Sequence, residues 1–298
     1  MATGLTPWTM GPFQAGDPPE AFLNRVPNIS ETPGTEPFDF IVCVTKNCPD
    51  ISPTVVDLIS PAVTPGHTVI VLIQNGLNIE RPIFAAYPQN IVLSGVSMID
   101  SHEAELGHIV HEEKDSLQLG PFHNPNLDAA VEERAAKAFI EIYGAGGKTN
   151  CHFCQDVPFA RWRKLVFNAC LNPICAITGL DDARIRLADG AVEGLVRPAM
   201  REIVATAAAL GHELPEDIMD FMINLDPMDL YLRPSMQCDS EKGNYLEFEN
   251  LVGEPMRDAI EVDVPTPTLR VIYELCKALQ WKTKEARGLV VVPPKRRI

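Results

Sequence analysis

The sequence predicts an α/β domain followed by an all-α domain. Three short apolar runs of strand character alternate with helical segments in the first half of the chain, and strand signals stop near residue 158. Strands that alternate with crossover helices imply a parallel sheet with right-handed connections. A chain of 298 residues is long enough to form two hydrophobic cores.

In the first half, residues 1–37 are rich in Pro, Gly, Thr and Glu, and we expect them to be irregular. The three predicted strands are "FDFIVCVT" (38–45), "HTVIVLIQ" (67–74) and "NIVLSGVSMI" (90–99), separated by the helical segments "DISPTVVDLISPAV" and "IERPIFAAYP". Two shorter runs, "GHIVHEE" and "SLQLGPF", predict an antiparallel extension at the edge of the sheet. The Ala-rich segment 126–144 predicts an amphipathic helix that ends at "GAGG".

From residue 158 onward the pattern is helical. Pro158, Pro215 and Pro267 stand at predicted helix starts, where proline is tolerated. The predicted helices cover residues 158–178, 191–211, 215–224, 240–260 and 267–281. We therefore expect an α/β domain over 1–157, a helical domain over 158–285 and a tail over 286–298.

Composition and charge exclude several classes of protein. Hydrophobic residues make up 46% of the chain and charged residues 22%, as in ordinary globular proteins. A formal net charge of −15 opposes binding to nucleic acids or anionic membranes. With neither a signal peptide nor an apolar run long enough to span a bilayer, the expected location is the cytoplasm. The eight cysteines are scattered, several in apolar runs, which favours reduced thiols.

The helical segment "RWRKLVFNACLNPICAITG" (161–179) carries three polar residues among apolar ones. Lys164, Asn168 and Asn172 are four residues apart, so they share one stripe of a helix. A buried polar group without a partner costs about 1–3 kcal/mol. We therefore expect the stripe to face other polar side chains or a ligand.

Polar residues also follow two of the predicted strands. Lys46 follows the first strand, and Gln74, Asn75 and Gly76 follow the second. Ligands of open parallel sheets bind beyond the carboxyl ends of the strands. The alternative is that these residues form solvated turns, because Asn-Gly is a common turn pair.

These motifs resemble those of the ketopantoate reductase family, which reduces 2-dehydropantoate to pantoate with NADPH. The matching segments, in order and spacing, are "VTKN", "QNG", "RWRKLVFNACLNP" and "RPSMQCDSEKGNYLEFENLVG". The resemblance covers roughly residues 38–281, and its most specific part in the last segment is Ser235 followed by Glu247.

The resemblance implies that Lys164 is the general acid. Asn168, Asn172 and Asn75 would bind the substrate, with Ser235 at its carboxylate or hydroxyl end. A hydride that reaches a ketone carbon leaves negative charge on oxygen, which a lysine can stabilise and protonate. The alternative is that Lys164 pairs with a carboxylate, Glu247 or Asp239, and only ties helices together.

The resemblance also implies NADPH as the cofactor, with Lys46, Asn75 and Glu247 along it and Asn75 near the nicotinamide. The sequence departs from the family here, because it lacks the G-x-G-x-x-G turn of a Rossmann-type sheet that holds the pyrophosphate. We therefore expect a partial Rossmann-type sheet without its first β-α-β unit, and weak binding of NADPH. "YGAGGKTN" (143–150) follows a helix, so it predicts a helix stop and not a phosphate loop.

No metal site is expected. The single C-x-x-C motif, Cys151 and Cys154, has no second pair at zinc-site spacing. His102, His108 and His111 lie among glutamates in a segment that is more typical of a solvated sheet edge.

The first functional hypothesis is an NADPH-dependent reductase of a small 2-oxoacid that forms a homodimer through its helical domain. The second is a non-catalytic descendant of the family that serves as a dimerisation or binding module. A third interpretation is that the sequence is an incomplete gene model. NADPH fluorescence in the presence of the protein distinguishes the first hypothesis from the second.

Overall fold

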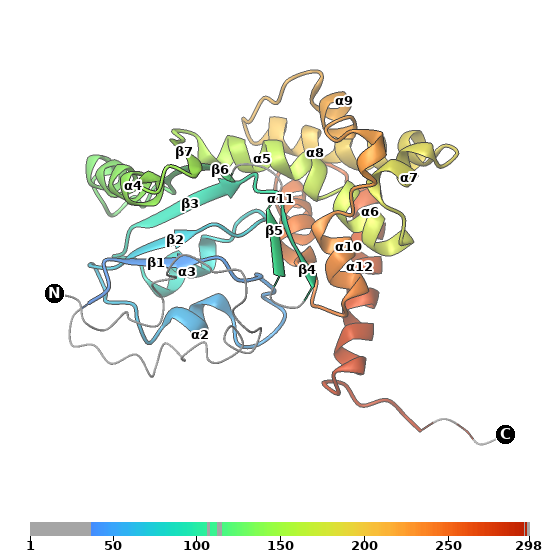
Figure 1. Cartoon of the computed structure of the whole chain (residues 1–298), viewed down its shortest axis with the longest axis horizontal. Coiled ribbons are helices and arrows are strands. Elements are labelled where there is room, and N and C mark those ends of the chain that lie inside the picture. Colours follow the sequence, from blue (N-terminus) through green and yellow to red (C-terminus); the bar gives the residue numbers. More distant parts are fainter. Residues whose placement is uncertain (1–36, 106–107, 112–114, 295, 297–298) are drawn as a thin grey trace. The chain divides into compact units, whose positions relative to one another are not determined.

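The computed structural model describes residues 37–294 and 296, except 106–107 and 112–114 (Figure 1). The chain forms two compact units. The first contains the described residues up to Val44 together with Pro53–Gln74 and Glu80–Val157, and the second contains Thr45–Ser52, Asn75–Ile79 and the chain from Pro158 onward. The predicted fold class is confirmed, because the described strands all lie in the first unit and the second is helical.

The first unit is built on a mixed sheet of five strands in the order β1-β2-β3-β6-β7. Strands β1 (Phe40–Cys43), β2 (Val69–Leu72) and β3 (Val92–Ser97) run parallel, as predicted. Strand β6 (Asp115–Pro121) is antiparallel to β3, and β7 (Thr149–Phe153) is parallel to β6. Every residue of β2 is buried, which explains its uninterrupted apolar sequence.

Three helices accompany this sheet. The short helices α2 (Val55–Ile59) and α3 (Arg81–Ala86) follow β1 and β2 in the chain. Helix α4 (Ala129–Gly144) packs Ala136 and Phe139 into the core formed by the strands. The amphipathic pattern predicted over 126–144 therefore marks the face that this helix buries.

Two details of the sheet differ from the prediction. The run "GHIVHEE" does not extend the sheet, because β5 (His108–His111) pairs with β4 (Ser101–Glu105) in a separate two-stranded sheet. Strand β7 was not predicted. It pairs on one side only and most of its residues are exposed or half-buried, so its sequence carries no apolar run.

The second unit contains no strand among its described residues. Its α-helices are α5 (Val157–Asn168), α6 (Leu171–Thr178), α7 (Asp182–Leu187), α8 (Arg197–Ala209), α9 (Ile218–Ile223), α10 (Ser235–Glu241), α11 (Glu254–Glu261) and α12 (Pro267–Ala286). Two π-helical turns, η2 (Val192–Val196) and η4 (Glu249–Gly253), lead directly into α8 and α11, and η3 (Met228–Leu230) is a short 3₁₀ turn.

Two predicted helices are interrupted. The segment 158–178 breaks after Asn168 into α5 and α6. In an unbroken helix the ring of Pro173 would clash with the carbonyl of Ala169, four residues earlier, and Pro173 has no N–H to donate to that carbonyl. The segment 240–260 is also not one helix, since α10 ends at Glu241 and helical structure resumes only at η4.

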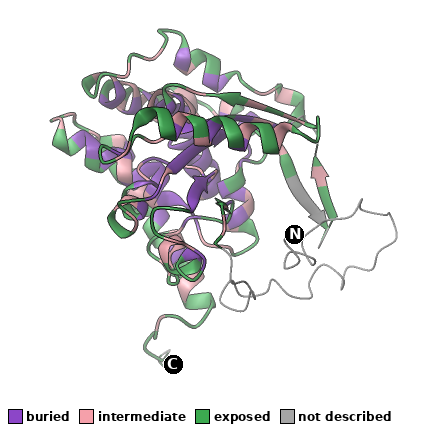
Figure 2. Ribbon diagram, turned by 90° about the vertical axis from the view of Figure 1, so that its left-hand side faces the viewer, coloured by how far each residue is buried: buried purple, intermediate pink, exposed green. Residues whose placement is uncertain are grey.

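Figure 2 shows buried residues on the inner sides of the elements and exposed residues on their outer sides. The core of the second unit includes Trp162, Leu165, Ile174, Met200 and Phe248. Three of these residues come from the segment 161–179, so the apolar character of that segment reflects burial. None of the described helices has the length and apolar character that crossing a membrane requires.

Candidate active site

The polar segments that follow β1 and β2 in the chain both belong to the helical unit. Residues Thr45–Ser52 carry Lys46, and residues Asn75–Ile79 carry Asn75 and Gly76. Gln74, the remaining polar residue at the second strand end, belongs to the sheet unit and is buried. The helical unit therefore holds all of the predicted site residues.

Lys164 lies on α5 and contacts the second of these segments. Its Nζ donates a hydrogen bond of 2.7 Å to Oδ1 of Asn75. Burial and, to a smaller extent, the positive charge of Arg161 lower the pKa of Lys164 to about 8, against the opposing effect of the negative charge of Glu247. The structure thus places an ammonium group of reduced pKa against a side-chain amide.

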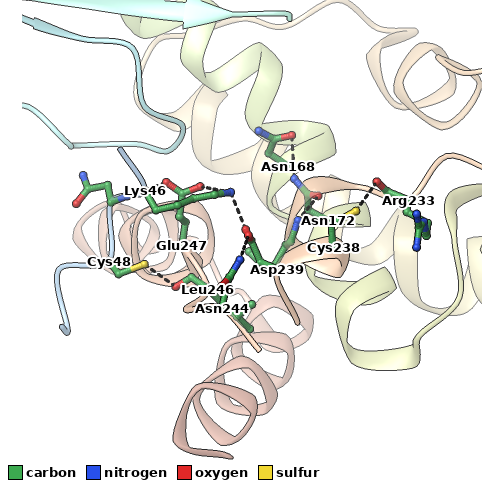
Figure 3. Close-up of polar contacts among 12 residues, drawn as sticks. Lys46, Cys48, Asn168, Asn172, Arg233, Cys238, Asp239, Asn244, Leu246 and Glu247 are labelled. Carbon is green, nitrogen blue, oxygen red and sulfur yellow. Dashed lines mark hydrogen bonds and ion pairs between the residues drawn. The ribbon is translucent and has the colours of Figure 1, made fainter. Parts of the chain in front are cut away.

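Asn168 and Asn172 are buried and contact each other across the break between α5 and α6. Nδ2 of Asn172 donates to Oδ1 of Asn168 at 3.2 Å (Figure 3). Oδ1 of Asn172 accepts a hydrogen bond of 3.4 Å from the backbone N–H of Met236, at the start of α10. Ser235, the first residue of α10, is exposed beside this contact. The helix break therefore leaves the two amides of the predicted stripe in contact.

Lys46 joins two carboxylates that come from distant parts of the sequence. Its Nζ lies 2.6 Å from Oδ2 of Asp239 and 3.4 Å from Oε2 of Glu247 (Figure 3). The backbone N–H of Asn47 donates to Oε1 of Glu247 at 2.8 Å. Both carboxylates are buried, whereas the Lys46 side chain is 47% exposed. One side of this ion-pair cluster is thus open to solvent.

The pKa values of this cluster follow from burial and charge. Desolvation raises the pKa of Glu247, although Lys46 and the Asn47 N–H favour its ionised form. Desolvation disfavours the charged form of Lys46, but Glu247 and Asp239 outweigh it, so the pKa of Lys46 is raised. Lys46 therefore stays a cation, and Glu247 holds a proton more readily than an ordinary glutamate does.

The turn at Gly76 is fixed by close contacts inside the helical unit. Gly76 has a φ of +102°, and a Cβ there would lie 2.5 Å from Cβ of Asn250. Leu77 exchanges two hydrogen bonds with Asn250. The N–H of Leu77 donates to the backbone carbonyl of Asn250 at 2.8 Å, and Nδ2 of Asn250 donates to the carbonyl of Leu77 at 3.0 Å. The carbonyl of Gly76 accepts a 2.8 Å hydrogen bond from Arg161. The Asn-Gly pair is thus a packed turn and not a solvated one.

The structure brings the predicted residues together in three contacts: Lys164 with Asn75, Asn168 with Asn172, and Lys46 with Glu247. Sequence reasoning named Asp239 only as an alternative partner of Lys164 and did not single out Arg161. Both are buried charged residues, and no sequence signal marks that burial for Arg161, which stands beside Trp162, Arg163 and Lys164. Among the residues that the structure describes, no group of three His, Cys, Asp or Glu side chains could hold a metal ion.

The arrangement suits acid–base chemistry on an uncharged oxygen. An ammonium group with a pKa near 8 can stabilise a developing oxyanion and then protonate it. Side-chain amides both donate and accept hydrogen bonds without adding charge.

Comparisons with known proteins point to one family. The family model "Ketopantoate reductase PanE/ApbA" matches residues 13–124, and "Ketopantoate reductase PanE/ApbA C terminal" matches residues 156–280. "Uncharacterized protein YDL144C" of Saccharomyces cerevisiae is 33% identical over 291 residues, which cover 91% of this chain and 80% of that protein.

Two solved structures share the fold. The crystal structure of 2-dehydropantoate 2-reductase from Methylococcus capsulatus aligns with a TM-score of 0.68 and 31% identity, over 86% of this chain and 78% of that chain. The ternary structure of D-mandelate dehydrogenase with NADH and anilino(oxo)acetate aligns with a TM-score of 0.72 and 22% identity, over 86% of this chain and 80% of that chain.

Proposed function

Because the chain belongs to the ketopantoate reductase family, whose members include oxidoreductases, we propose that it is an NADPH-dependent reductase of a 2-oxoacid resembling 2-dehydropantoate. The observation that carries this proposal is the contact between Lys164 and Asn75, which holds an ammonium group of pKa about 8 in a polar site. The homodimer and the cytoplasmic location stay predictions.

Lys164 acts as the general acid in the proposed reaction. As the ketone carbon is reduced, its oxygen gains negative charge, and Nζ stabilises that oxygen and donates a proton to it. A pKa of about 8 keeps most of this group protonated at neutral pH and makes it a stronger acid than an ordinary lysine. Asn75 orients Nζ through the 2.7 Å hydrogen bond.

Asn168, Asn172 and Ser235 bind the substrate in this proposal. The two buried amides bind the polar groups of the 2-oxoacid, and Ser235, which is exposed, meets its carboxylate or hydroxyl end. Amide and hydroxyl groups bind an anion through neutral donors, which stabilise the ground state less strongly than a charged donor would. Binding energy is then left for the transition state.

Lys46, Asn75 and Glu247 would hold the cofactor, which when bound supplies the hydride. The donor set fits a nicotinamide nucleotide, since the half-exposed Lys46 can meet an anionic or hydroxyl group and Glu247 can accept from a ribose hydroxyl. The predicted lack of a glycine-rich turn concerns the first part of the chain, and residues 1–36 lie outside the described residues.

The test is oxidation of NADPH by 2-dehydropantoate and other 2-oxoacids with the full chain and with Lys164→Ala. We expect Lys164→Ala to lower turnover by roughly 10²- to 10⁴-fold, the usual contribution of a positioned general acid. Lys282→Ala, on the exposed side of α12, is the matched control and should retain full activity. Full activity of Lys164→Ala would exclude the proposed role, and failure to bind NADPH would favour the non-catalytic module.

A further inference from the structure

Arg161 is a buried charged residue whose position the proposed chemistry does not yet explain. It lies on α5 one turn before Lys164, so the two cations occupy neighbouring positions of one helix. Arg161 is only 5% exposed. A buried charge is costly, and a second cation next to it adds repulsion, so a purely structural helix would not favour this pair.

The guanidinium group of Arg161 reaches the turn that carries Asn75. Its Nη1 donates a 2.8 Å hydrogen bond to the carbonyl of Gly76. Asn75, the preceding residue, accepts the 2.7 Å hydrogen bond from Lys164. Arg161 and Lys164 therefore contact adjacent residues of the same turn from the same helix.

The other side of the turn is fixed by Asn250, which exchanges two hydrogen bonds with Leu77. Gly76 has a positive φ and lies too close to Asn250 to carry a side chain. The turn thus has contacts from two helical segments: Asn250 of η4 holds Leu77, and Arg161 and Lys164 of α5 hold Gly76 and Asn75.

We propose that Arg161 is a positioning residue for the reaction: it holds the Asn75–Gly76 turn against α5 so that Asn75 orients Lys164, and it places a fixed positive charge one turn from the Lys164 ammonium. This inference rests on the proposed function of Lys164. The two effects are separable, since the hydrogen bond requires a donor of the right length and the electrostatic effect requires only charge. The fixed charge also accounts for part of the lowered pKa of Lys164.

Two variants of the full chain separate these effects. Arg161→Met removes the charge and keeps much of the side-chain volume. It should raise the pKa of Lys164 by about one pH unit. Arg161→Lys keeps the charge but shortens the side chain and loses the planar guanidinium group. It should leave that pKa near its present value, shift the side-chain amide signal of Asn75 and lower kcat roughly tenfold.

The pKa is measured by NMR titration of isotope-labelled lysine, with the Lys164 signal assigned by its loss in Lys164→Ala. Arg163→Met, on the same helix and stacked over Phe221, is the control and should change neither the titration nor the Asn75 signal. An unchanged Lys164 titration in Arg161→Met, or an unchanged Asn75 signal in Arg161→Lys, overturns the proposal. If Arg161→Met does not fold, the Asn75 signal in Arg161→Lys decides. Neither NMR readout needs turnover, so an inactive chain would refute the proposed function without deciding this inference.

Discussion

The lowered pKa of Lys164 predicts a specific loss of activity as the pH rises. The group donates a proton, so only its ammonium form is active. With a pKa of about 8, about nine-tenths of the free enzyme is active at pH 7 and about one-tenth at pH 9. We therefore expect kcat/KM to fall by about tenfold between these values, with its midpoint near pH 8.

The assay follows the initial rate of NADPH oxidation at low substrate concentration and constant ionic strength, because kcat/KM reports the pKa values of the free enzyme. Lys282→Ala should show the same profile as the wild-type chain, since Lys282 is exposed on α12. If the lysine had its ordinary pKa of 10.5, kcat/KM would stay nearly unchanged up to pH 9. A profile that stays flat to that pH therefore refutes the role of Lys164 or the effect of its burial.

Two further predictions concern residues around Lys164. Glu247→Gln keeps an oxygen that can accept from the Asn47 N–H but removes a negative charge that raises the Lys164 pKa. The midpoint of the pH profile should therefore move below 8, and a move upward would contradict this assignment. Gly76→Ala forces a Cβ to 2.5 Å from Asn250 at a φ of +102° and should cost roughly 1–3 kcal/mol in the free energy of unfolding, measured by denaturant titration. Gly146→Ala, where a Cβ would meet nothing within 4 Å, should change stability little, and equal losses in both variants would refute the steric explanation.

The order and type of most elements could be predicted from the sequence because they depend on local patterns. The uninterrupted apolar run at β2 and the amphipathic pattern of α4 record how much surface each element buries. Strand β7 could not be predicted, because an edge strand is held by hydrogen bonds to one neighbour and its exposed residues need no apolar pattern. The separate pairing of β4 with β5 likewise depends on which partner strand is available in space.

The candidate site was predictable only where the polar residues repeat at helical spacing or match a family motif. Lys164, Asn168 and Asn172 stand out because they interrupt an apolar helix. Asp239 does not stand out, since its partner Lys46 is 193 residues away in the sequence. Arg161 stands among charged and aromatic neighbours, and only its burial shows that its charge is used inside the protein.

The sequence by itself determined the fold class, the family resemblance and the residue types available for acid–base chemistry, because these follow from periodicity, composition and spacing along the chain. The tertiary structure alone decided which of these groups touch. It paired Lys46 with Asp239 and Glu247, set Asn75 against Lys164, and fixed the Gly76 turn with Arg161. The physical reason is that hydrogen bonds and charge interactions act over a few ångströms in space, whereas a sequence pattern records only which residues share an element.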